Sequence, residues 1–263
     1  MTATMREMLA TQRLKLGTFV VEFDTPGMGQ IIKAAGGDFV IVDMEHSGFN
    51  LAGLKRMLRY YQSADVRVIV STAVGDYDVI ARACDMGADA IQPAKVGSAG
   101  EAREMLAHMR YPPKGDRGVA LGIAHDRYRP GDTAHKLRRA NRETIFFPKI
   151  ETRRGIENIE AIAALDGVDG IWIGHFDLSV DMGIPAEFDH PDFAAAPKRV
   201  ARACRNNKIS LGCIAESVEV GTALNRLGFD FLCYSGDIWL LRDALKTGLD
   251  TLRAEHRKAK RRN

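Results

Sequence analysis

The chain has 263 residues, of which 46% are hydrophobic and 27% charged, a balance typical of a water-soluble globular protein with a full core. Its formal net charge is +3, but the last seven residues carry five cations and no acid, so the rest of the chain is slightly acidic. The positive charge therefore belongs to a tail from about residue 257, interpreted as a solvated helix end. It does not indicate a nucleic-acid-binding face.

The cysteines and the amino-terminal segment indicate the expected compartment. Cys84, Cys204, Cys213 and Cys233 form no C-x-x-C pair and lie mostly in apolar runs, so we expect buried, reduced thiols. Residues 1–17 are polar and predicted to be helical, with no signal-peptide core. No apolar run reaches the roughly eighteen residues of a membrane span. We therefore expect a soluble, cytoplasmic protein without membrane partners.

Short β-branched runs recur along the whole chain, each followed by a helical stretch. They are continuously apolar, as parallel strands buried on both faces require. The predicted strands occupy residues 17–22, 38–43, 67–72, 89–93, 144–150, 169–173, 209–214 and 230–234. Amphipathic helices are predicted at residues 27–35, 51–62, 77–86, 99–109, 134–142 and 155–165.

This alternation predicts the fold class. Eight strand–helix units in one chain of this length are typical of a single (β/α)8-barrel domain covering residues 1–263. A doubly wound open sheet is disfavoured, because residues 22–27 after the first strand are not a glycine-rich phosphate loop. The longest insertion, residues 111–132, separates the fourth helix from the fifth strand, and a loop of this length is expected to be functional.

Polar residues at the carboxyl ends of the strands are the first candidates for an active site in such a barrel. Glu151 and Asp177 follow the fifth and sixth predicted strands, which are neighbours. Two carboxylates suit a divalent metal such as Mg²⁺ or Mn²⁺, which would act as a Lewis acid. From spacing alone, an equally good interpretation is that each carboxylate caps the helix that follows it.

The second predicted strand ends with Asp43 and His46. His46 is a candidate general acid or base, since an imidazole titrates near neutrality. The alternative is an ordinary surface histidine. Asp43 would orient His46 or a metal-bound water, or else cap the strand end.

Four strings of the sequence, in the same order, resemble the HpcH/HpaI aldolase family. That family comprises metal-dependent 2-oxo acid aldolases that act through a pyruvate-type enolate. The resemblance implies a barrel of the phosphoenolpyruvate/pyruvate type. The strings are DFVIVDMEH (38–46), RYPPKGDRGVA (110–120), KIETRRGIENI (149–159) and DGIWIGHFDLSVDMGIP (169–185).

The resemblance also implies roles for single residues. Glu151 and Asp177 match the family's metal ligands, for Mg²⁺, Mn²⁺ or Co²⁺. His46 matches the acid–base residue, and Asp43 matches the residue that orders metal-bound water. Asp85 matches an aspartate that pairs with the catalytic histidine across a subunit interface.

The segment Gly174, His175 and Phe176 is expected to receive the substrate carboxylate through backbone N–H groups at a helix start. Relatives are commonly hexamers. A homo-oligomer, either a hexamer or a trimer of dimers, is therefore expected for this chain.

The chain departs from the family pattern at two positions. Family members usually carry an arginine at the end of the third strand, where it contacts the 2-oxo oxygen, and here Ser71 occupies that position. A hydroxyl supplies no cation. Lys149 stands where relatives typically have glutamine, and it shares a strand face with Glu151. We hypothesise that Lys149 replaces the missing arginine; Lys95 is a weaker candidate.

Three functions remain open at this stage. The first is a metal-dependent lyase that cleaves or forms a C–C bond next to a 2-oxo acid. In the second, Lys149 forms a Schiff base, which is disfavoured because anionic Glu151 would stabilise its ammonium form. The third is a non-catalytic 2-oxo acid binding protein that has lost its activity with the arginine. Separately, the alternative role for Lys149 is that it only neutralises Glu151. The aldehyde is not identified, although Arg117, His125 and Arg127 of the insertion would suit an acidic one.

Overall fold

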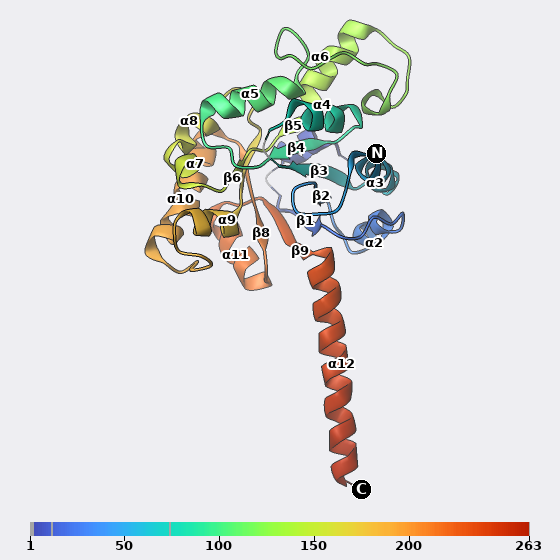
Figure 1. Ribbon diagram of the computed structural model, residues 1–263, viewed down its shortest axis with the longest axis vertical. Coiled ribbons are helices and arrows are strands. Elements are labelled where there is room, and N and C mark those ends of the chain that lie inside the picture. Colours follow the sequence, from blue (N-terminus) through green and yellow to red (C-terminus); the bar gives the residue numbers. More distant parts are fainter. Residues whose placement is uncertain (1–2, 12, 74, 263) are drawn as a thin grey trace.

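A computed structural model describes residues 3–11, 13–73 and 75–262. Its strands form one curled, fully parallel sheet with helices outside it (Figure 1). The order in the sheet is β5-β4-β3-β2-β1-β9-β8-β7-β6. The strands are β1 (Lys15–Val20), β2 (Phe39–Asp43), β3 (Arg67–Thr72), β4 (Ala90–Pro93), β5 (Ile145–Phe146), β6 (Lys149–Ile150), β7 (Gly170–Ile173), β8 (Ser210–Ala215) and β9 (Phe231–Gly236).

All eight predicted strands are present, and the fifth is divided into β5 and β6 at Phe147 and Pro148. Proline lacks the N–H that a strand ladder needs. The first part of this segment pairs with β4, through Ile91 and Phe146, and the second part pairs with β7. The two ends of the sheet are therefore consecutive parts of one chain segment.

The helices follow the strands in alternation. The helices over residues 51–63, 77–85, 99–109 and 133–143 match the prediction closely, whereas the predicted 155–165 helix is two short ones. The helices are α1 (Met5–Leu9), α2 (Met28–Ala34), α3 (Leu51–Ser63), α4 (Tyr77–Asp85), α5 (Ala99–Met109), η1 (Ala124–Asp126), α6 (Thr133–Glu143), α7 (Arg153–Glu157), α8 (Ile159–Ala163), α9 (His175–Asp181), α10 (Pro191–Asn207), α11 (Val218–Leu227) and α12 (Asp237–Arg262).

The core has two parts because successive strand residues point to opposite faces. Val40 and Val42 of β2 face outward and pack in the cluster between sheet and helices. Phe39 and Ile41 of the same strand face inward and belong to a second cluster, rich in aromatic rings. This inner cluster fills the space enclosed by the curled sheet, so residues at the carboxyl ends of the strands stand on a packed apolar floor.

The amino-terminal prediction was wrong in part. Only Met5–Leu9 is helical among the described residues before β1, and β1 begins at Lys15. Met5 and Met8 are buried and belong to the inner cluster. The segment therefore packs its apolar side against the interior, a tertiary contact that its polar composition does not indicate.

The long insertion lies at the amino ends of the strands. It follows α5 and precedes β5, so it occupies the end where helices return to strands. Residues of η1 line a cavity together with Arg67 at the start of β3 and Asp89 just before β4. The expectation that this loop shapes the site at the carboxyl ends is therefore wrong within one chain.

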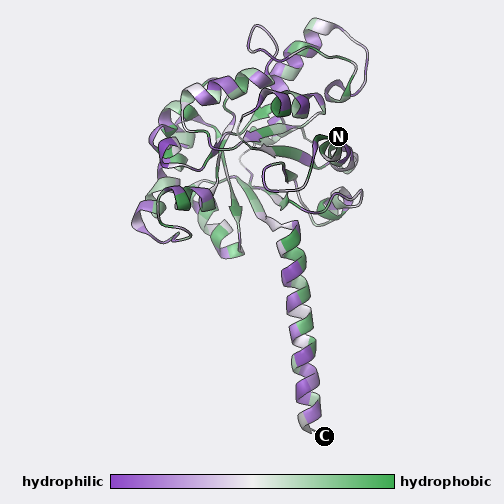
Figure 2. Cartoon of the chain, viewed as in Figure 1, coloured by the Kyte–Doolittle hydropathy of each residue, from purple (hydrophilic) through white to green (hydrophobic). Residues whose placement is uncertain are grey.

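The last helix, α12, projects from the body as a single long rod (Figure 1). Its direction is set at its start, where the Asp237 carboxylate accepts backbone N–H groups of Val21, Glu22 and Phe23. Figure 2 shows apolar residues recurring along the rod and a polar carboxyl end. The basic residues from about 257 belong to this helix, as the tail interpretation expects.

Leucines form a stripe on α12. Leu241, Leu245, Leu249 and Leu252 recur at helical spacing and are 47% to 69% exposed. An apolar groove of about 750 Å³ lies beside the start of the helix, between α2 and α11, and is lined by residues that include Ile31, Val218 and Leu240. The rod and the groove thus leave two apolar surfaces uncovered in one chain.

All four cysteines are buried and free, as expected. Among the described residues, no helix is both long and apolar enough to cross a bilayer.

Candidate active site

A layer of polar side chains crowns the inner core at the carboxyl ends of β2, β3 and β4. Asp43 is the register partner of Ser71, and Ser71 is the register partner of Gln92. All three are fully buried. Lys149 and Glu151 extend the layer across the divided strand, so residues far apart in sequence meet at one end of the sheet.

Glu151 is buried at 2% exposure and accepts a hydrogen bond from the Lys95 backbone N–H at 2.8 Å. Burial raises the pKa of its carboxyl to about 7, against the lowering effects of Lys149 and the Lys95 N–H. The charges of Glu45 and Asp177 add to the rise. The carboxylate is therefore short of positive charge in the metal-free chain.

This raised pKa predicts an unusual pH dependence of stability in metal-free protein. The folded state holds a proton on Glu151 up to about pH 7, whereas an unfolded glutamate loses it near pH 4.5. The free energy of unfolding should therefore fall as pH rises from about 5 to 8, by at most about 3 kcal/mol. Urea denaturation in EDTA at both pH values measures it, and Glu151→Gln should flatten this fall. An equal slope in the variant would contradict the prediction.

Neither metal-ligand candidate caps a helix. The cap of α7 is Thr152, whose side chain accepts from the Gly155 N–H, and α9 has Gly174 at its cap with no side-chain hydrogen bond. Glu151 and Asp177 are thus free of that structural role. Gly174 matters for another reason: a Cβ there would lie 2.3 Å from Glu151 Oε2.

Lys149 is buried and its main partner is Glu45. Its Nζ lies 2.9 Å from Glu45 Oε2 and 4.0 Å from Glu151 Oε2. Lys149 therefore does not neutralise Glu151 alone, because it also pairs, more closely, with Glu45. Lys95 has an exposed side chain and contributes its backbone N–H instead.

The carboxylates of the site could bind a divalent cation only if ligands from outside the protein complete its coordination shell. Glu45, Glu151 and Asp177 bring three negative charges against the ammonium of Lys149. Among the described residues, no group of three or more His, Cys, Asp or Glu side chains is placed to hold a metal. Two carboxylates therefore supply part of a shell, and water and a chelating 2-oxo acid would complete it.

Asp43 shapes the turn after β2. Its two carboxylate oxygens accept the backbone N–H groups of Glu45 and His46, at 3.0 and 2.9 Å. This is the strand-end cap considered for it, and it positions Glu45 towards Lys149. His46 is 64% exposed, with Nε2 3.7 Å from Glu45 Oε2, so it stands at the rim of the site.

Asp85 does not meet His46 in one chain. It ends α4, at the amino end of β4, and its Oδ1 accepts hydrogen bonds from the Arg117 guanidinium at 2.6 and 3.2 Å. Arg117 is 1% exposed and so is not available to a substrate. His125 hydrogen-bonds to Ala120 O and Tyr111. These loop residues therefore lie away from the site.

Gly174, His175 and Phe176 do lie at the carboxyl end of β7, with one correction. The Gly174 N–H donates to Ile150 O, so it is not free to bind a carboxylate. His175 and Phe176 begin α9, where first-turn N–H groups lack helical acceptors. Burial lowers the pKa of His175, against the opposing effect of Glu216. Both residues line a cavity of about 380 Å³ with Trp239 of α12.

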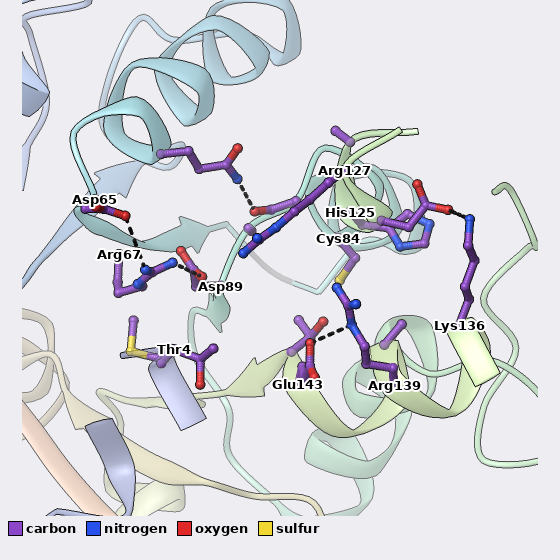
Figure 3. A pocket seen from close by; sticks show the side chains of 18 of the residues that line it. Thr4, Asp65, Arg67, Cys84, Asp89, His125, Arg127, Lys136, Arg139 and Glu143 are labelled. Atoms are coloured by element: carbon purple, nitrogen blue, oxygen red, sulfur yellow. Dashed lines mark hydrogen bonds and ion pairs between the residues drawn. The ribbon is translucent and has the colours of Figure 1, made fainter. Parts of the chain in front are cut away.

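Figure 3 shows a different cavity, of about 420 Å³, at the amino ends of the strands. Its charged side chains pair with each other: Arg67 with Asp89 at 3.5 Å, and Arg139 with Glu143 at 3.0 Å. Of the residues expected to carry chemistry, only His125 and Arg127, the candidates for contacting the aldehyde, line it, and no metal-ligand or acid–base candidate does. We therefore place the active site at the opposite end, around Glu151.

Two residues of the site were missed from sequence. Glu45 belongs to the quoted string DMEH and lies two positions after Asp43, but its partner Lys149 is 104 residues away. Gln92 ends a predicted strand beside Ser71, a polar residue in an apolar run. That exception to the pattern was the available signal.

Comparison with known proteins now identifies the family. The model of the HpcH/HpaI aldolase/citrate lyase family matches residues 15–240. The chain belongs to this family. It is 28% identical to 2-keto-3-deoxy-L-rhamnonate aldolase of Klebsiella pneumoniae, over 87% of this chain and 85% of that one.

Other members of the HpcH/HpaI family agree. A hydroxypyruvate/pyruvate aldolase of Delftia acidovorans is 31% identical, covering 88% of this chain and 86% of that one. The crystal structure of an HpcH/HpaI aldolase from Desulfitobacterium hafniense superposes with a TM-score of 0.89, at 29% identity, over 95% and 96% of the two chains. These relatives are aldolases, which are carbon–carbon lyases.

Proposed function

We propose that this chain is a divalent-metal-dependent aldolase that forms or cleaves a C–C bond through the enolate of pyruvate or a related 2-oxo acid. The observation that carries the proposal is the buried Glu151 carboxylate, whose pKa is raised to about 7 among further carboxylates. Such a site is short of positive charge. Its location at the carboxyl ends of a curled parallel sheet and the family membership support the same function.

The proposed roles follow from position. Glu151 and Asp177 would hold Mg²⁺, Mn²⁺ or Co²⁺, which, when bound, polarises the 2-oxo group as a Lewis acid. The first-turn N–H groups of His175 and Phe176 would orient the substrate carboxylate. His46, at the rim, would move a proton to or from the aldol hydroxyl through water, while Asp43 holds the turn that carries His46.

Lys149 would steady the enolate oxygen in place of the third-strand arginine. Its ammonium lies 4.0 Å from Glu151 Oε2, close to where the 2-oxo oxygen must sit if Glu151 binds the metal. Glu45 holds the side chain in that direction from the other side. The neutral hydroxyl of Ser71 cannot carry this charge.

Substitution of this lysine tests its role. Lys149→Gln should lower kcat by about 100-fold or more, because a preorganised cation facing the oxyanion is lost. The melting temperature should change by only a few degrees, since glutamine can still donate to Glu45. Steady-state kinetics and thermal denaturation measure both, with the exposed Lys198→Gln as the control. Equal losses of turnover and stability would refute the role.

Two alternatives are tested by the same preparations. A Schiff-base lysine would be trapped on Lys149 by borohydride with pyruvate, but two carboxylates hold its ammonium in ion pairs, which disfavours the free amine nucleophile. A non-catalytic binding protein would bind pyruvate or oxalate with metal, yet would not exchange the pyruvate methyl protons with solvent. Exchange that EDTA stops would support the aldolase.

The substrate class is drawn from relatives as a proposal. Their names include 2-keto-3-deoxy-L-rhamnonate aldolase and hydroxypyruvate/pyruvate aldolase. We propose pyruvate or hydroxypyruvate as the nucleophile and an aldehyde as its acceptor. Aldehydes tested with each acid, with and without metal, would identify the acceptor.

We also propose that the chain is one (β/α)8-barrel domain of the phosphoenolpyruvate/pyruvate type and that it forms a homo-oligomer, a hexamer or a trimer of dimers. Support for the barrel comes from the β5–β6 segment, which bonds both ends of the sheet. Support for the oligomer comes from the uncovered leucines of α12 and the apolar groove between α2 and α11. We propose that a second copy's α12 fills this groove.

A further inference from the structure

Two polar side chains in the floor of the site lack hydrogen-bond partners within the part of the chain that the structure describes. Ser71 of β3 and Gln92 of β4 are register partners and are fully buried. Among the described residues, the Ser71 hydroxyl and both amide atoms of Gln92 have no hydrogen-bond partner. Buried donors and acceptors are nearly always paired, because burial has removed their water. A pair of unpartnered groups side by side therefore points to a ligand.

Both side chains face into the site. Ile69 of β3 and Ala90 of β4 belong to the inner core cluster. Residues two apart on a strand share a face, so Ser71 and Gln92 point inward as well, one step nearer the carboxyl ends. They stand on the apolar floor and below the catalytic groups.

The ion pair of Lys149 and Glu45 lies at the same end of the sheet as Ser71 and Gln92. In the sheet order, β3 and β4 lie between β2 and the segment that carries β6. Lys149 on β6 pairs with Glu45, just after β2, at 2.9 Å, so this ion pair links the two sides of the intervening strands β3 and β4. The same ammonium lies 4.0 Å from Glu151. Ser71 and Gln92 thus form the neutral part of the candidate active site, and Lys149 and Glu151 form its charged part.

The chemistry of the pair selects its ligand. A hydroxyl and a carboxamide can each both donate and accept hydrogen bonds. A carboxylate or phosphate only accepts, and would leave the Gln92 carbonyl oxygen unpaired. A methyl group would leave every atom of the pair unpaired. An alcohol hydroxyl both donates and accepts, and so it satisfies the pair.

We propose that Ser71 and Gln92 form a subsite for the hydroxyl on C3 of the 2-oxo acid. The enzyme would then select 3-hydroxy-2-oxo acids over pyruvate, whose C3 is an unsubstituted methyl group. This inference rests on the proposed function, because C3 is the carbon next to the carbonyl that the metal would bind. Holding the C3 hydroxyl also fixes the geometry of the enolate that forms there, and so the configuration of the product.

The test measures metal-dependent exchange of the C3 protons with D₂O by NMR, for 3-hydroxypyruvate and for pyruvate. The wild-type chain should favour 3-hydroxypyruvate in kcat/KM. Ser71→Ala and Gln92→Met should each reduce that preference by about 10-fold or more, because a site built to bind a hydroxyl rejects a substrate without one. The product of an aldol reaction should also lose diastereomeric purity in both variants.

Thr72→Val is the matched control. Thr72 is also buried with an unpartnered hydroxyl, but it points to the opposite face of β3, so its loss should leave the preference unchanged. Gln92→Met should keep or raise the melting temperature, because an unpaired polar group is replaced by an apolar one of similar shape. This measurement separates lost selectivity from unfolding.

The outcomes distinguish failure of the proposed function from failure of the Ser71–Gln92 subsite alone. No exchange of either acid by the wild-type chain would overturn the proposed function, and this inference with it. Exchange of both acids with a preference that Ser71→Ala and Gln92→Met leave unchanged would overturn this inference alone, and the pair would then hold structural water. A wild-type preference for pyruvate would also overturn it.

Discussion

Replacing Glu151 by glutamine is expected to lower turnover by about 10³-fold or more, the largest effect of any single substitution considered for this chain. The carboxylate is 2% exposed and approaches one backbone N–H and one ammonium. Burial raises its pKa to about 7, and the charges of Glu45 and Asp177 add to the rise, so the ionised carboxylate lacks full compensation by positive charge. A divalent cation would supply that charge, and glutamine would no longer attract one.

Two measurements check this expectation. EDTA should abolish the activity of the wild-type chain, and Mg²⁺, Mn²⁺ or Co²⁺ should restore it. Metal at about 100 times its dissociation constant should also stabilise the wild-type fold by about 2.7 kcal/mol, and it should not stabilise Glu151→Gln. Thermal denaturation with and without metal provides a readout that does not depend on turnover.

A second ligand variant and a control variant complete the test of Glu151. Asp177→Asn should behave like Glu151→Gln, because both carboxylates are proposed ligands. Glu157→Gln, an exposed carboxylate on α7, should change neither turnover nor metal-dependent stability. An enzyme that keeps its activity in EDTA would contradict the metal proposal.

Disruption of the α12 stripe is expected to break the assembly into smaller oligomers or monomers. Leu245→Asp with Leu249→Asp places two charges where we propose that a second copy's groove buries leucine. Each buried leucine contributes roughly 1.5 kcal/mol or more, and an exchange of helices counts each one twice. Sedimentation velocity or light scattering should show the full oligomer for the wild-type chain and a smaller species for the variant.

The control lies on the opposite side of the same helix. Thr247 is exposed and points away from the leucines, so Thr247→Asp adds a charge without touching the stripe. It should leave the assembly intact. A wild-type chain that is monomeric at micromolar concentration, or a leucine variant with the same mass in solution as the wild-type assembly, would refute the proposed insertion of α12 into a second copy's groove. The result does not depend on metal or substrate.

The parallel sheet could be predicted from sequence because its signal is local. Continuous apolar runs such as residues 38–43 have no other place than a strand buried on both faces. Their carboxyl ends share one edge of the sheet, which is why Asp43, Ser71 and Glu151 could be grouped before any coordinates were known. The break at Phe147 and Pro148 was not predicted, although proline is its physical cause.

Placement of the loops was predicted less well. The 111–132 insertion was expected beside the substrate, but it follows a helix, and such a connection lies at the amino ends of the strands. Arg117 was interpreted as a residue that could contact an acidic aldehyde and is instead buried against Asp85. Composition shows that a loop is polar, whereas only packing shows what its polar groups meet.

The sequence by itself determined the strands and the polar strand ends that carry Glu151 and Asp177, and it supplied the hypothesis that Lys149 replaces a third-strand cation lost at Ser71. These features depend on residue type and on spacing along one strand. The tertiary structure decided that Lys149 pairs with Glu45 and that α12 leaves the body. It also decided that the polar side-chain atoms of Gln92 and Ser71 have no hydrogen-bond partner among the described residues. Those features depend on contacts between distant segments, which the free energy of packing selects and no local pattern encodes.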